Sequence, residues 1–155
     1  MTIRTLAMRM LRYGPWAIQQ HMPLLEQAGL LDNERVLWIV NHVTFARRLW
    51  LERVRDGRIT SSPTDVVDAR AALARCTDDT AAWIAWLESV ASDELNVDIR
   101  FVTLERERVT QSLADIVMHV INHSTHHTHE LGVILRANGV APTPTDYIVY
   151  SRQHP

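Results

Sequence analysis

The sequence has one cysteine, no long apolar run and no excess of positive charge. The single thiol, Cys76, excludes both a disulfide framework and a cysteine-rich zinc site. The formal net charge of −2, with histidines neutral, argues against a surface that binds nucleic acid. No stretch reaches the roughly 18 uncharged apolar residues of a membrane span, and the N-terminal residues lack the apolar core of a signal peptide. We therefore expect a cytoplasmic protein that binds neither nucleic acid nor membranes.

The 155 residues contain enough apolar material, 46%, to build one packed core. We expect a single domain over residues 1–155. Because thiols are scarce and histidines are abundant, nitrogen and oxygen are the expected donors of any metal site. Cys76 is expected to be a small buried residue rather than a nucleophile.

Four long segments repeat apolar residues at the three- and four-residue steps of an amphipathic helix. We expect helices over about residues 3–28, 33–56, 64–91 and 110–138, and a short helical turn over 146–152. Ser62 or Thr64 is the expected cap of the third helix, and Thr110 that of the fourth. Residues 92–108 include β-forming side chains and are expected to form an irregular connection with a short hairpin. The pattern predicts an all-α fold, a four-helix bundle with one long crossover connection.

The second expected helix has two different faces. At about 100° per residue, one stripe is made of Trp38, His42, Phe45 and Leu49. This stripe predicts that His42 faces the core. The other face, expected to be solvated, carries Arg47, Arg48, Glu52 and Arg55.

The last expected helix is rich in histidine. His119, His123 and His127 are four residues apart, so their side chains lie on one face of a helix. Two histidines at this spacing can bind one metal ion, as in the H-E-x-x-H metalloproteases. No Glu follows the first histidine here, so the protease motif is absent and the pair needs a third ligand from elsewhere.

We predict that His42 is this third ligand and that the metal site consists of His42, His123 and His127. Two alternatives remain open: His42 is a buried histidine with one hydrogen bond, and the cluster is a pH-sensitive surface patch with adventitious metal affinity. We favour the metal site because His42 and His127 both fall on core-facing stripes, where an unpaired imidazole is costly. We expect His119, one helical turn before His123, either to donate a hydrogen bond next to the metal ligands or to replace one of them. Three protein ligands with an open position suit catalysis, with a water or a thiolate in that position.

Several short motifs follow one another in a characteristic order. They are Tyr13…Trp16-Ala17, Asn41-His42 with Arg48-Leu49-Trp50-Leu51, the block His119-Val-Ile-Asn-His-Ser-Thr-His-His127, Leu135-Arg-Ala-Asn-Gly139, Pro142 and Asp146-Tyr147-Ile148. In this order the chain resembles the DinB (damage-inducible, YfiT-like) superfamily over almost its whole length.

The resemblance implies a four-helix bundle, often dimeric, that binds nickel or zinc through three histidines matching His42, His123 and His127. Relatives include thiol S-transferases and a thiol-dependent isomerase that act with low-molecular-weight thiols. We therefore expect a homodimeric, metal-dependent thiol S-transferase or hydrolase, with His119 and His126 as candidate catalytic proton carriers. The alternative is a non-catalytic metal-binding stress or DNA-damage-inducible protein in which the ion is structural.

One departure from the family pattern affects the substrate side of the site. The family commonly continues the histidine block with Arg-Gly-Gln, whereas Thr128-His129-Glu130 follow here. The chain therefore lacks an arginine that would hold a substrate anion at this position, but it loses no metal ligand.

Overall fold

The computed structural model describes residues 1–91, 95–103 and 106–155. Most of them are helical, and the elements are α1 (Ile3–Gln27), α2 (Glu34–Asp56), α3 (Ala69–Ser89), β1 (Asp98–Val102), β2 (Arg108–Ser112), α4 (Leu113–Ala137) and α5 (Tyr147–Gln153). The predicted mainly helical chain is confirmed. None of the described helices is both long and apolar enough to cross a membrane.

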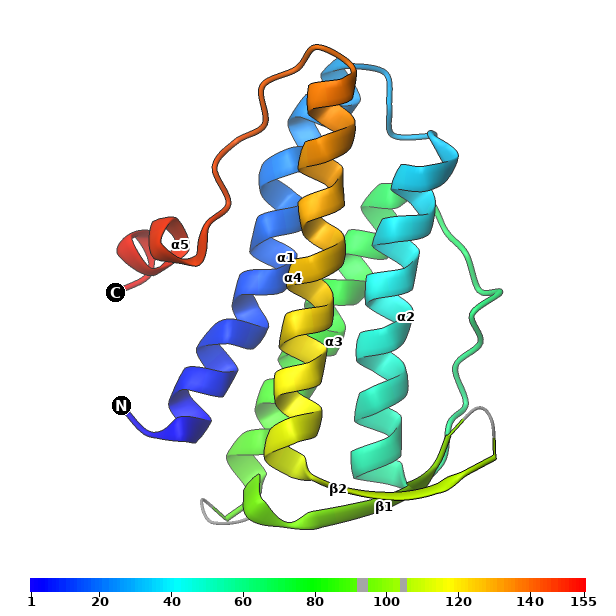
Figure 1. Ribbon diagram of the computed structural model, residues 1–155, viewed down its shortest axis with the longest axis vertical. Coiled ribbons are helices and arrows are strands. Elements are labelled where there is room, and N and C mark those ends of the chain that lie inside the picture. Colours follow the sequence, from blue (N-terminus) through cyan, green and yellow to red (C-terminus); the bar gives the residue numbers. More distant parts are fainter. Residues whose placement is uncertain (92–94, 104–105) are drawn as a thin grey trace.

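The long helices are arranged so that α1 and α2 each pack against both α3 and α4. The antiparallel pair β1–β2 passes across one end of these helices (Figure 1). Two apolar clusters fill the interior. One is centred on Ile18, Val40 and Leu131, and the other on Leu11, Trp83 and Val120.

The third helix begins later than the sequence predicted. It starts at Ala69 because Asp68 is its cap: the Asp68 carboxylate accepts a hydrogen bond of 2.8 Å from the Ala71 N–H. The hydroxyls of Ser62 and Thr64, the predicted caps, instead pair with each other at 2.8 Å in an exposed turn. Several residues of the chain fit a helix cap, and packing of the following helix selects among them.

The fourth helix also begins later, at Leu113. Its cap is Ser112, whose hydroxyl oxygen accepts a hydrogen bond of 3.1 Å from the Asp115 N–H. The predicted cap, Thr110, lies within β2 and pairs with Arg100 of β1. The predicted hairpin is therefore present and longer than expected, and residues 92–94 and 104–105 of the predicted connection lie outside the described residues.

The buried face of α2 differs from the face predicted to be buried. Arg47 and Glu52 were expected in solvent, yet they are only 1% and 8% exposed. Trp38 was placed on the core stripe, yet it is 43% exposed. The stripe that packs into the core consists of Val36, Ile39, Val40 and Val43. The prediction that His42 faces the core is therefore wrong: His42 lies half-buried at the edge of the interface between α2 and α4.

Arg47 is held in the interior by oxygen atoms of three other helices. Its guanidinium donates hydrogen bonds to the Leu11 carbonyl at 3.2 Å, the Thr80 hydroxyl at 3.0 Å and the Ser124 hydroxyl at 3.0 Å. Gly14 makes room for this group, since a Cβ at position 14 would lie 2.7 Å from Arg47 Nη2. The side chain thus ties α2 to α1, α3 and α4 at one level of the structure.

Candidate metal centre

Three histidines from two helices meet in one half-buried cluster. The ring centroids of His42 and His123 are 4.8 Å apart, those of His42 and His127 4.7 Å, and those of His123 and His127 4.6 Å. One ring nitrogen of each lies within 4.8 Å of the others. The Nε2 atoms of His42 and His123 are 3.0 Å apart, and two nitrogens bound to one tetrahedral zinc lie about 3.3 Å apart. The three rings therefore fit one divalent ion with little movement.

The packing of α2 against α4 explains why these rings meet. His123 and His127 are one helical turn apart on α4, and α2 brings His42 opposite them. Trp38, one turn before His42, stacks on the His42 ring at 4.4 Å between centroids and 12° between planes. The same indole meets the His127 ring edge-on at 5.4 Å. Trp38 therefore restricts the orientation of two of the three rings.

Glu130 orients the third ring. Its Oε1 atom lies 2.8 Å from His127 Nδ1, and its other carboxylate oxygen forms an ion pair with Arg35. With Nδ1 engaged, Nε2 is the ring nitrogen of His127 left for a metal ion, which is the usual arrangement behind a ligating histidine. Sequence reasoning recorded Glu130 only as a departure from the family pattern. The signal that could have found it is its spacing of three residues from His127 on one helix.

Burial favours the neutral form of two of the clustered rings, those of His42 and His123. Desolvation, followed by the charge of His127, lowers the pKa of His42 below its ordinary value. The same causes, with His42 also contributing, lower the pKa of His123 to about 4. Neutral imidazole is the form that binds a metal ion. His42 and His123 are therefore favoured in the form that can bind a metal ion at neutral pH.

A cleft of about 510 Å³ borders the cluster. His42 and His123 line it together with His119, Trp50 and Arg53. The His119 ring lies 5.6 Å from that of His123 and 5.3 Å from that of Trp50, between centroids. A small molecule in the cleft would therefore contact two of the clustered histidines and a further imidazole.

The far wall of the cleft is aromatic and carries one positive charge. Trp50 of α2 meets Phe101 of β1 edge-on, with 5.1 Å between ring centroids. The Arg53 guanidinium carbon lies 4.6 Å from the Trp50 ring and 5.1 Å from the Phe101 ring. Such a wall suits a largely apolar molecule, and the cleft as a whole is lined by one arginine and one carboxylate, that of Asp115.

The two predicted proton carriers, His119 and His126, lie in different pockets. His119 lies on the cleft, whereas His126 is exposed and lines a different pocket, with its ring 4.9 Å from that of His127 between centroids. Cys76 is fully buried, and burial raises the pKa of its thiol. The expectation that Cys76 is a buried residue is confirmed.

The chain was compared with models of known protein families and with curated proteins. A protein-family model described as the DinB family matches residues 31–154, a range that includes α2 to α5 and all three clustered histidines. A search of curated proteins found no match.

Proposed function

The chain belongs to the DinB family, and we propose that it is a metal-dependent enzyme of the thiol S-transferase or hydrolase type. The observation that carries this proposal is the position of the cluster. Three imidazoles that fit one ion, His42, His123 and His127, lie at the edge of a cleft large enough for a small molecule. A closed structural site would have no need of such access.

The bound ion in this proposal is zinc or nickel, because neutral imidazoles suit both. When bound with an open coordination position, such an ion lowers the pKa of a water or thiol ligand and so supplies a nucleophile near neutral pH. The chain's own residues have distinct tasks. His42, His123 and His127 hold the ion, and Glu130 and Trp38 orient their rings.

The cleft supplies binding and proton transfer in this proposal. His119 is the proton carrier, since it lines the cleft beside His123, whereas His126 does not line it. Trp50 and Phe101 hold the apolar part of the substrate.

We also propose the quaternary and architectural features that family membership favours, a homodimer and the four-helix bundle class for α1 to α4. An apolar groove between α1 and α4, with Ile3 and Met118 exposed, is a surface that a second copy could cover. Size-exclusion chromatography with in-line light scattering tests this, and elution at the mass of one chain would contradict the dimer.

Metal analysis of protein purified without a histidine tag tests the ligands. We expect one divalent ion per chain, lost in His42→Ala and in His123→Ala and retained in the control His129→Ala. A second group, His126, His127 and Glu130, also brings donor atoms within 4.8 Å. Metal content that survives His42→Ala but is lost in His126→Ala would move the ion to that group and overturn the assignment.

Thermal shift with low-molecular-weight thiols tests the reaction class. Cysteine and glutathione are suitable probes, each with and without a chelator and with His42→Ala as the control. Stabilisation by one thiol that requires both the metal and His42 is the expected result. No stabilisation by any thiol, together with a large loss of stability on chelation, would favour the non-catalytic protein in which the ion is structural.

A further inference from the structure

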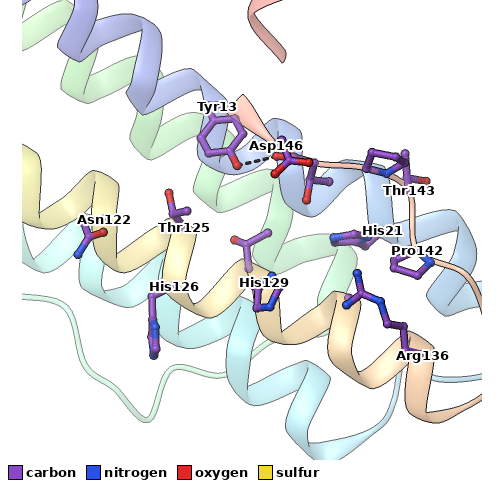
Figure 2. Close-up of a pocket in the computed structure, with 14 residues that line it drawn as sticks. Tyr13, His21, Asn122, Thr125, His126, His129, Arg136, Pro142, Thr143 and Asp146 are labelled. Atoms are coloured by element: carbon purple, nitrogen blue, oxygen red, sulfur yellow. Dashed lines mark hydrogen bonds between the residues drawn. The ribbon is translucent and has the colours of Figure 1, made fainter. Parts of the chain in front are cut away.

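A second pocket, of about 680 Å³, lies between α4, α1 and residues 142–146 (Figure 2). None of His42, His123 and His127 lines it. It uses a different side of α4 from the metal centre. The segment that closes it is fixed to α1 by the Tyr13 hydroxyl, which donates a hydrogen bond of 2.6 Å to the Thr145 carbonyl.

Two polar side chains in the wall of this pocket are buried without a partner. His21 and Thr128 are each only 2% exposed. Among the described residues, neither His21 Nδ1 nor Thr128 Oγ1 has a hydrogen-bond partner. A buried polar atom left unpaired costs about 1–3 kcal/mol. Figure 2 shows the His21 ring directed from α1 toward the pocket, so a molecule bound there can satisfy these groups.

The same end of the pocket is positively charged. Arg136 extends from α4 toward His21 (Figure 2), and within the described part of the chain it forms no ion pair. Burial, followed by the charges of Arg136 and His129, lowers the pKa of His21 to about 4. The ring of His21 therefore stays neutral at pH 7 and can donate one hydrogen bond.

We propose that this pocket binds a small molecule through an anionic group, a carboxylate or a phosphate, held by Arg136, His21 and Thr128. Arginine offers two parallel N–H donors to such a group. The imidazole and the hydroxyl supply single donors that are already fixed by burial.

The opposite end of the pocket limits the ligand further. Asp146 lies there, close to Tyr13. Burial is the main cause that raises the pKa of the Tyr13 phenol, and the charge of Asp146 raises it further. No side-chain hydrogen bond engages this carboxylate as a helix cap. A second anionic group would meet Asp146 and be repelled. The pocket therefore favours a molecule with one anionic end and a neutral or cationic far end.

Amide NMR titration of the full-length chain tests this inference, with acetate and inorganic phosphate as separate probes at constant ionic strength. All titrations use His42→Ala protein treated with a chelator, so that a metal ion cannot bind the probe. We expect saturable shifts at residues 128–136 and 142–146 for at least one probe. In Arg136→Gln, affinity should fall by about tenfold or more, as for loss of one hydrogen bond to a charged group. Acetamide, the neutral analogue of acetate, should produce no such shifts.

Arg100→Gln is the matched control, because it removes an exposed arginine on β1, outside the pocket. It should leave the titration unchanged. Equal affinity in Arg136→Gln and in Arg100→Gln would overturn the proposal and show only adventitious binding of anions. The absence of saturable shifts with both probes would also overturn the proposal and would show that the pocket holds only water. Neither result would bear on the metal centre, whose ligand His42 is removed throughout.

Discussion

Glu130 is the residue whose role in the metal centre is most open to a direct test. Its carboxylate contacts His127 Nδ1 and also pairs with Arg35. Removal of such a hydrogen-bond partner of a ligating histidine typically costs about 10- to 100-fold in metal affinity. We predict a loss of this size for Glu130→Ala, measured by competition with a chromophoric chelator.

The conservative variant Glu130→Gln separates orientation from ligation. Its amide oxygen can still accept a hydrogen bond from His127 Nδ1, so affinity should recover most of the loss. If Glu130 were itself a ligand, as the group His126, His127 and Glu130 would require, the Gln variant should bind as weakly as the Ala variant.

Gly14 is a position where one methyl group should destabilise the whole protein. A Cβ there would lie 2.7 Å from Arg47 Nη2 and 3.4 Å from the Ser124 Cβ. Arg47 cannot move without breaking its hydrogen bonds to Leu11, Thr80 and Ser124. We predict that Gly14→Ala lowers the free energy of unfolding by about 1–3 kcal/mol, as overpacking of a core does, measured by urea denaturation.

A double-mutant cycle identifies the cause of this loss. In an Arg47→Met background the guanidinium is absent, so Gly14→Ala should cost clearly less than in the wild-type protein. A penalty of equal size in both backgrounds would show that Arg47 is not what the added methyl group meets.

At the scale of elements, Glu52 connects the end of α2 to the loop that follows. Its carboxylate accepts hydrogen bonds from the backbone N–H and the hydroxyl of both Thr60 and Ser61, at 2.7 to 3.0 Å. Burial alone would raise the pKa of Glu52, but these hydrogen bonds outweigh burial and leave the pKa below its usual value. The loop is therefore held by an ionised carboxylate.

The lowered pKa fixes the pH dependence of this contribution. Because the pKa of Glu52 is lower in the folded protein than in the unfolded chain, the ionised carboxylate stabilises the fold at pH values above the unfolded-state pKa, about 4.3. This stabilisation is lost as the pH falls through the folded-state pKa. We predict that Glu52→Gln costs about 1–2 kcal/mol at pH 7, and that this cost becomes smaller as the pH falls below about 4.3. Glu88→Gln, at an exposed glutamate of α3, is the control and should cost little at either pH.

The elements also show what local sequence could and could not determine. Apolar periodicity located the four long helices, and the spacing of His123 and His127 located two of the three clustered histidines. Helix starts were less certain, because Thr64 and Thr110 fit the local pattern of a cap as well as Asp68 and Ser112 do. Pairing of β1 with β2 decided the second case, and strand pairing depends on residues remote in sequence.

The burial of α2 could not be derived from its own sequence. Arg47 and Glu52 resemble surface residues until their partners on other segments are known. The role of Glu130 was missed for a related reason. Its hydrogen bond to His127 points to a role beside the cluster only when His42 is known to lie against the same ring. The sequence predicted which histidines form the cluster, and long-range packing determined which helix faces became interior.

At the scale of the whole molecule, His21 should couple global stability to pH. The pKa of His21 is lowered to about 4 by burial and then by Arg136 and His129 of α4, while Asp146 lines the same pocket from the C-terminal segment. An unfolded histidine titrates near 6.5. Between these values the unfolded chain binds more protons than the folded one, so stability must fall as pH falls from about 6.5 to about 4.

The size of this effect follows from the same linkage. One proton per molecule changes the free energy of unfolding by about 1.4 kcal/mol per pH unit, so His21 accounts for at most about 3 kcal/mol across the window.

We predict that His21→Leu reduces the loss of stability between pH 6.5 and 4, measured by urea denaturation in a buffer without carboxylate or phosphate. The other titratable groups are the same in both proteins, so their contributions cancel in the comparison. Parallel stability curves for the two proteins would contradict the lowered pKa.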